Sequence, residues 1–204
     1  MVTIKSKEEA MSYHYVASAQ PATAVRAAIV CNFLSASARN LVICKSNRIE
    51  VHEYDSEQGL VAAMDEPLNG RIVSLKSYRP PNESKDVLFI LTERLLFCIL
   101  EYDEQKKKIT SRCTGSVKDK IGRPLDDGPQ VAVDPNNRVI SMRLYEGLFK
   151  VIAVDQGLKE SVTMRMKELR VLDVQFLHEC LKPTIAVLYN ELDDTATRHM
   201  TSYT

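Results

Sequence analysis

Short apolar runs alternate with polar turns along almost the whole chain. The runs are rich in Val, Ile, Leu, Phe, Tyr and Thr and are bounded by Asn, Asp, Gly or Pro, a pattern typical of strands joined by tight turns. Sustained helical periodicity with capping residues is missing, and only residues 8–13 have room for one helical turn. The pattern therefore predicts an all-β protein.

One strand–turn–strand unit recurs along the chain. Each copy has an apolar strand, a short polar turn and a second, more alternating strand; the copies are 41–54, 87–102, 139–154 and a fourth that begins at 184–189 and returns at 198–203. They start at residues 41, 87, 139 and 184, which are 46, 52 and 45 residues apart. This period is near the roughly 40–50 residues of a four-stranded propeller blade.

Each hairpin is flanked by further strands. An apolar strand precedes each one, at 23–33, 71–78, 130–134 and 168–177, and a more polar strand follows each complete one, at 60–64, 108–113 and 161–166. Buried inner strands are expected to be apolar, and outer edge strands to be short and polar. The sequence thus predicts a partial β-propeller of three and a half four-stranded antiparallel blades, at residues 23–65, 71–114, 130–166 and 168–204. Residues 1–15 are interpreted as an N-terminal extension, and 16–204 as the incomplete propeller.

Net charge and hydropathy argue against two classes of partner, nucleic acids and membranes. Lys plus Arg and Asp plus Glu number 27 each, so the net charge is zero, whereas a duplex-binding domain usually shows a basic excess. Direct contact with nucleic acid is therefore not expected. The longest apolar run, 87–100, is interrupted by polar residues and too short to span a bilayer, and the N-terminus lacks the apolar core of a secretory signal. We expect an intracellular, soluble chain without membrane contact.

The residues that carry catalysis or hold metals do not form recognisable motifs. The five cysteines are scattered without a C-x-x-C pair, and the four histidines lack a partner at metal-binding spacing. Nucleophile-elbow and phosphate-loop motifs are missing too. Residues 126–128 and 134–137 have the composition of tight turns rather than of calcium loops. We therefore predict no enzyme, no metal and no cofactor.

The longest predicted loop spans residues 115–128. Loops of this length usually have a function or are mobile. Within residues 118–124 a glycine and a proline restrict the backbone, while two cations and Ile121 remain available to a partner. Contact with a partner and a solvated loop are equally compatible with this composition.

Several blocks of the sequence resemble one known family. They are residues 11–16, 19–25, 83–86, 88–92, 98–102, Asp119, 121–124, 143–145, 147–152, Val174, 176–177 and 183–185. In them the chain resembles the first propeller of the large subunit of the damaged-DNA-binding protein, the adaptor of cullin-4 RING ubiquitin ligases. Large propeller subunits of the pre-mRNA cleavage/polyadenylation factor and of a splicing factor share this architecture, but the block at 11–16 favours the ubiquitin-ligase adaptor.

The resemblance implies a non-enzymatic protein-interaction scaffold, linked to DNA repair and protein ubiquitination in the nucleus and cytoplasm. The implied partners are propeller-type substrate receptors. In the family a second propeller docks the cullin, and a third forms the receptor cleft with the first; this chain is expected to stop at Thr204, inside the fourth blade of the first propeller. The alternative is a related propeller subunit of the cleavage/polyadenylation or splicing machinery that binds RNA or its protein partners.

The family's receptor cleft implies three partner-binding residues, Lys120 and Arg123 in the long loop and Arg165 near a blade edge. Lys120 stands where the family resemblance leads us to expect arginine, which retains the positive charge but loses bidentate geometry. Such a cationic rim suits the carboxylates or helix C-termini of a receptor's docking segment.

Overall fold

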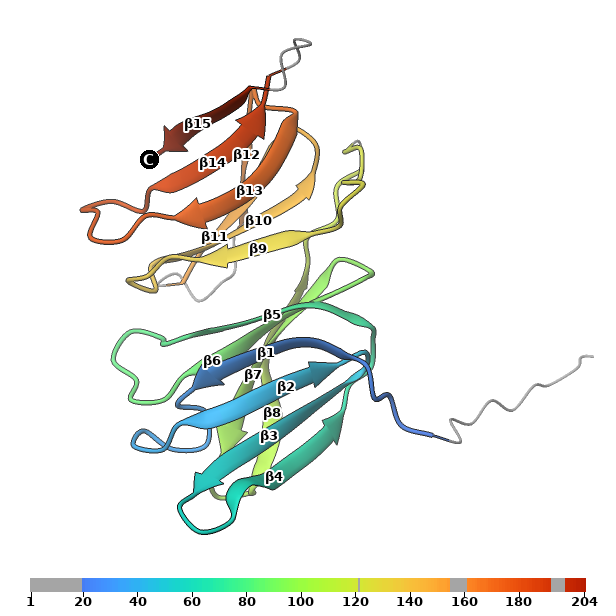
Figure 1. Ribbon diagram of the computed structural model, residues 1–204, viewed down its shortest axis with the longest axis vertical. Helices are drawn as coiled ribbons and strands as arrows, with labels where there is room; N and C mark the ends of the chain where they lie inside the picture. Colours follow the sequence, from blue (N-terminus) through green and yellow to red (C-terminus); the bar gives the residue numbers. More distant parts are fainter. Residues whose placement is uncertain (1–19, 121, 155–160, 192–196) are drawn as a thin grey trace, which may run out of the picture.

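The computed structural model describes residues 20–120, 122–154, 161–191 and 197–204. In these ranges fifteen strands form three four-stranded sheets and one three-stranded sheet, each antiparallel and each continuous in sequence (Figure 1). The prediction of an all-β, propeller-type architecture is confirmed. Within the same ranges, no helix is long and apolar enough to cross a membrane. The predicted extension, residues 1–15, and the helical turn at 8–13 lie outside the described residues.

The four sheets follow one another along the chain. The first contains β1 (Val25–Cys31), β2 (Asn40–Lys45), β3 (Arg48–Asp55) and β4 (Gly59–Pro67). The second contains β5 (Ile72–Tyr78), β6 (Val87–Thr92), β7 (Leu96–Asp103) and β8 (Lys108–Ser116). The third contains β9 (Gln130–Val133), β10 (Val139–Tyr145), β11 (Leu148–Ala153) and β12 (Ser161–Arg165). The last has β13 (Arg170–Phe176), β14 (Ile185–Asn190) and β15 (Arg198–Tyr203).

Neighbouring sheets meet through their first strands. β1 lies beside β5, β5 beside β9, and β9 beside β13. Because the strands of each sheet alternate in direction, their turns divide between two ends of the molecule (Figure 1). We call the end that holds the turns at 46–47, 93–95 and 146–147 the rim end. The end that holds the turns at 32–39, 79–86, 134–138 and 177–184 is the brace end.

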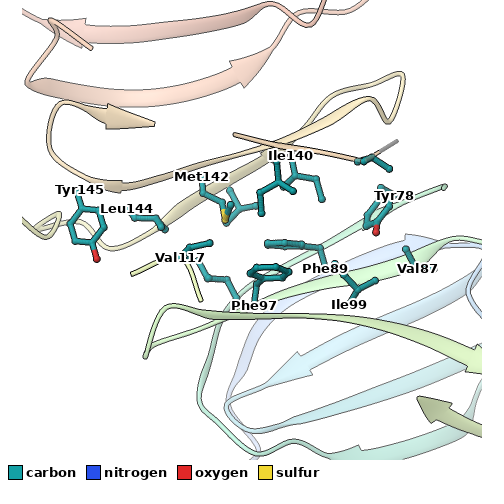
Figure 2. Close-up of a cluster of buried hydrophobic side chains, with 14 residues drawn as sticks. Tyr78, Val87, Phe89, Phe97, Ile99, Val117, Ile140, Met142, Leu144 and Tyr145 are labelled. Atoms are coloured by element: carbon teal, nitrogen blue, oxygen red, sulfur yellow. The ribbon is translucent and has the colours of Figure 1, made fainter. Parts of the chain in front are cut away.

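The hydrophobic core is divided into three clusters, one between each pair of neighbouring sheets. Strand β6 contributes to two of them, because successive side chains of a strand point to opposite faces. Leu88 and Ile90 join the cluster with the first sheet, and Phe89 joins the cluster with the third sheet. Figure 2 shows Phe89 in this middle cluster, facing Ile140 and Met142 of β10. A strand buried on both faces explains the unbroken apolar run that the sequence shows at β6.

The burial of the strands differs from the expected gradient in two respects. The outer strands β4, β8 and β12 are largely exposed, as expected, but β4 and β8 have nine residues each and are not short. In the first three sheets the second strand, not the first, is the most deeply buried: five of the six residues of β6 are buried, whereas only one of the seven residues of β1 is. Strand β6 has a strand on both sides within its sheet and a neighbouring sheet on each face, which explains its burial.

Hydrogen bonds connect the sheets at the brace end. Arg79 donates from Nε to Asp86 Oδ1 at 2.8 Å and from Nη2 to Asn32 Oδ1 at 3.3 Å, and its backbone N–H donates to Asn137 Oδ1 at 3.2 Å. The backbone N–H of Asn32 donates to Asp86 Oδ2 at 2.7 Å. These bonds hold the first three sheets in a defined relation to one another.

Candidate partner-binding site

The long loop between β8 and β9 crosses the rim end and is attached to the β10–β11 turn. The N–H of Asp119 donates to the hydroxyl of Tyr145 at 2.7 Å, and the N–H of Glu146 donates to the carbonyl of Arg123 at 3.0 Å. Pro124 forms an isolated bridge with Tyr145. The described part of this loop is therefore held by the neighbouring blade rather than free in solvent, a choice that the sequence left open.

Gly122 allows the loop to approach the ring of Tyr145. A Cβ atom at this position would lie 2.5 Å from the ring atoms Cγ and Cδ1, far inside van der Waals contact. Any other residue would push the loop away from the turn. The glycine at position 122 is thus explained by packing against Tyr145.

The three predicted partner-binding residues lie around this one turn. Lys120 is exposed and directly follows Asp119, whose N–H is bonded to Tyr145. Arg123 is bonded through its carbonyl to Glu146, and its side chain is 72% exposed. Arg165 is exposed at the end of β12, where it pairs with Leu148. The tertiary structure therefore brings all three to the rim end of the third sheet, although 42 residues of sequence separate Arg123 from Arg165.

The charges of this rim are mixed, whereas the family resemblance implied a cationic rim. The guanidinium of Arg123 lies 3.9 Å from a carboxylate oxygen of Asp126 and 3.9 Å from one of Glu146. Exposed ion pairs at such distances contribute little to stability, because water screens them. Arg123 therefore remains available to a carboxylate of a partner.

A buried cation lies beneath the rim. Arg143 is only 4% exposed in the middle of the apolar strand β10, and its Nη1 donates to Gln130 Oε1 at 3.3 Å. Burial lowers the pKa of the Arg143 guanidinium, and the carboxylates of Asp127 and Glu146 partly oppose this effect. Sequence reasoning missed this residue, although a lone arginine inside an apolar strand was a visible signal.

A small cavity of ≈ 210 Å³ separates the long loop from the start of β13. Its lining includes Asp127, Arg143 and the partly exposed Leu169 and Leu172. These two leucines, 47% and 43% exposed, add an apolar lip beside the charged rim. The sequence pattern had assigned them only to the strand 168–177, because strand prediction does not say which side chains stay uncovered.

Two further observations concern metal binding and thiol reactivity among the described residues. Among them, no group of three or more His, Cys, Asp or Glu side chains is placed to hold a metal ion. Burial raises the pKa of the Cys31 thiol to about 12 and that of the Cys44 thiol to about 11, so neither is a nucleophile near neutral pH. The rim combines charged groups, hydrogen-bond donors and apolar contact area on a rigid support.

Tyr145→Phe is expected to loosen the long loop. Removing the hydroxyl deletes the acceptor of the Asp119 N–H, which is expected to destabilise the attachment of the loop by about 1 kcal/mol. Faster amide hydrogen exchange at Asp119 measures the effect, and Tyr54→Phe, at a 74% exposed position, is the matched control. Equal protection of Asp119 in wild type and Tyr145→Phe would show that the hydroxyl does not hold the loop.

Comparisons with known proteins agree with the fold. A family model described as RSE1/DDB1/CPSF1 first beta-propeller matches residues 24–204. The chain is 46% identical over 193 residues to DNA damage-binding protein 1b of Arabidopsis thaliana, 45% over 193 residues to DNA damage-binding protein 1 of Oryza sativa subsp. japonica, and 44% over 193 residues to that of Solanum lycopersicum. These matches cover 94% of this chain but only 17–18% of each relative. The resemblance read from the sequence is confirmed, and the chain belongs to the RSE1/DDB1/CPSF1 first beta-propeller family.

Proposed function

We propose that this chain is part of a non-enzymatic scaffold, the adaptor of a cullin-4 RING ubiquitin ligase, and that its rim contributes to the binding of propeller-type substrate receptors. The observation that supports this most directly is the gathering of Lys120, Arg123 and Arg165 around one turn, in a chain 46% identical to DNA damage-binding protein 1b. In this proposal the protein acts in DNA repair and protein ubiquitination, in nucleus and cytoplasm. The cullin is contacted by other regions of the adaptor.

The mechanism of such a scaffold is positioning. Tyr145 and the β10–β11 turn already hold the loop that carries Lys120 and Arg123, so a partner does not have to order it. Binding to a preorganised surface avoids part of the entropy cost of association. Charges at the rim of an interface mainly raise the association rate and select the partner. The weak pairs of Arg123 with Asp126 and Glu146 are readily exchanged for a partner's carboxylate.

A second candidate is a related propeller subunit of the pre-mRNA cleavage/polyadenylation or splicing machinery. The matched family description, which names RSE1 and CPSF1 beside DDB1, favours it. Against it, the five relatives that we compared are all named DNA damage-binding protein 1, or 1a or 1b, and the net charge is zero.

Affinity capture of the tagged chain from cells, with identification of the bound proteins by mass spectrometry, tests the proposal. The wild type is expected to recover propeller-type substrate receptors. The combined variant Lys120→Glu, Arg123→Glu, Arg165→Glu is expected to recover at least about tenfold less, because reversed charges repel the acidic partner surface. The matched control is Lys106→Glu, Lys107→Glu, Lys108→Glu, which changes the same charge at the β7–β8 turn, on the brace end. It is expected to bind within about twofold of wild type, since surface changes away from an interface have small effects.

Two outcomes would count against this assignment. Recovery of polyadenylation or splicing subunits in place of receptors would favour the second candidate. Recovery of receptors to the same extent by the rim variant and the control would show that the adaptor function does not use this rim. Circular dichroism of each variant excludes loss of the fold as the cause.

A further inference from the structure

A cavity of ≈ 440 Å³ opens on the face of the second sheet that is turned toward the first. Strands β6, β7 and β8 and the connection between β4 and β5 surround it. Its base is formed by Ile72, Ile90 and Leu100, which are 0–4% exposed and belong to the cluster between the first two sheets. At its mouth lie the exposed Leu96 and Ser111. The cavity is therefore a place where this hydrophobic cluster opens to solvent, and its lining includes none of Lys120, Arg123 and Arg165.

The lining of this cavity carries no charge. Every one of its residues is apolar, or is a glycine, serine, threonine, asparagine or cysteine. Near the mouth, Cys98 Sγ and Ser111 Oγ lie 3.2 Å apart, and either atom can be the donor. Burial raises the pKa of the Cys98 thiol, so it stays protonated and acts as a weak hydrogen-bonding group. An ion entering this cavity would lose its hydration without meeting a counter-charge, which is costly.

A β-bulge in β8 keeps a cation out of the cavity. Ile99 pairs with Cys113, but the next residue, Leu100, pairs with Ser111. Arg112 is therefore the extra, unpaired residue of the bulge. In a regular ladder Arg112 would stand opposite Leu100. Instead its guanidinium lies on the other face of the sheet, 2.5 Å from Glu83 Oε1 and 3.7 Å from Glu101 Oε2. Bulges commonly re-aim side chains next to binding sites, and here the bulge replaces a guanidinium with a small hydroxyl at the mouth.

We propose that this cavity binds a compact, neutral, mainly apolar organic molecule with one hydroxyl or carbonyl group, which hydrogen-bonds to the Cys98–Ser111 pair. Its volume lies within the range of roughly 300–1,000 Å³ that is usual for small-molecule pockets, and its combination of an apolar base with few polar groups is typical of them. The cavity shares no residue with the Lys120, Arg123 and Arg165 site, so this proposal does not depend on the proposed adaptor function.

The test uses the 204-residue chain and three probes of one shape: 2-naphthol, 2-naphthoate and 2-naphthylmethylammonium. NMR titration is expected to show that 2-naphthol binds at millimolar or lower concentration, with nuclear Overhauser effects to the methyl groups of Ile72, Ile90 and Leu100. The two charged probes are expected to bind at least about tenfold more weakly, because their charge is desolvated without a partner.

Ser111→Leu provides the matched loss-of-function variant. Its isobutyl group occupies the mouth, and the affinity for 2-naphthol is expected to fall at least about tenfold. Ser202→Leu makes the same substitution at an exposed position of β15, away from the cavity, and is expected to leave the affinity within about twofold of wild type.

Three results would overturn the proposal: no binding of 2-naphthol up to its solubility limit, equal binding of the three probes, or equal effects of the two leucine variants. Overhauser effects confined to methyl groups outside the cavity lining would also overturn it. If Ser111→Leu fails to fold, the Overhauser effects and the comparison of the charged probes still decide the question with the wild-type chain.

Discussion

Replacing Phe89 with alanine is expected to lower the free energy of unfolding by about 3–5 kcal/mol. Phe89 is fully buried in the cluster between the second and third sheets (Figure 2). Its ring stacks on Phe97 of the same sheet, with ring centroids 5.7 Å apart and planes 14° apart. Truncation removes the apolar contacts and leaves a cavity that the two facing sheets are too rigid to close. The contact between the two sheets should therefore weaken strongly.

Urea denaturation followed by circular dichroism measures this effect as a fall in the midpoint concentration. The control is Tyr54→Ala, which removes an aromatic side chain that is 74% exposed. It is expected to lower the free energy of unfolding by less than about 0.5 kcal/mol. A loss below about 1 kcal/mol in Phe89→Ala would mean that the middle cluster does not join the sheets in solution.

The second large effect is expected for Asp134→Ala, which should lower the free energy of unfolding by about 2–4 kcal/mol. The side chain of Asp134 is fully buried and accepts hydrogen bonds from Arg138: 2.7 Å from Nε, 3.0 Å from Nη2 and 3.2 Å from the backbone N. The same guanidinium donates to the carbonyl of Leu181 at 2.6 Å and to that of Cys180 at 3.3 Å, both in the loop between β13 and β14. Asp134 thus orients the arginine that ties the third sheet to the fourth.

Asp134→Ala is also expected to have a local effect, on the loop between β13 and β14. In Asp134→Ala the backbone N–H groups of residues 178–182 should exchange hydrogen faster than in wild type, because Arg138 is no longer held against the carbonyls of Cys180 and Leu181. Asp126→Ala, which removes an 83% exposed carboxylate, is the control and should leave this segment unchanged. Unchanged protection in Asp134→Ala would contradict the bracing role of the pair.

The same carboxylate predicts a dependence of stability on pH. Burial by itself raises the pKa of Asp134, but the hydrogen bonds and charge of Arg138 outweigh it, so the pKa lies below its ordinary value. The pKa in the folded protein is thus lower than in the unfolded chain, which means that the ionised carboxylate stabilises the fold above pH ~4 and loses this contribution as the pH falls further. The difference in unfolding free energy between wild type and Asp134→Asn should be complete at pH 7 and shrink in acid. A difference that grows on acidification would refute the assignment.

Much of the fold was readable from the amino-acid pattern. The four repeats and the strands that flank them were located within a few residues, because alternation, apolar runs and turn residues are local properties of the chain. Lys120, Arg123 and Arg165 were named through the family resemblance, and the structure places them around one turn, while their role in binding stays a prediction.

The rest depended on contacts between sheets. Composition left the state of the long loop open, and the approach of Gly122 to Tyr145, a residue of the next sheet, decided it. Three other features likewise depend on residues that are far apart in sequence or displaced in register. They are the burial of Arg143, the bulge at Arg112 and the hydrogen bonds from Arg138 to the β13–β14 loop. Local sequence patterns determine where strands begin and end; which polar groups meet is decided only when the sheets pack, since buried groups must then find partners across the interfaces between blades.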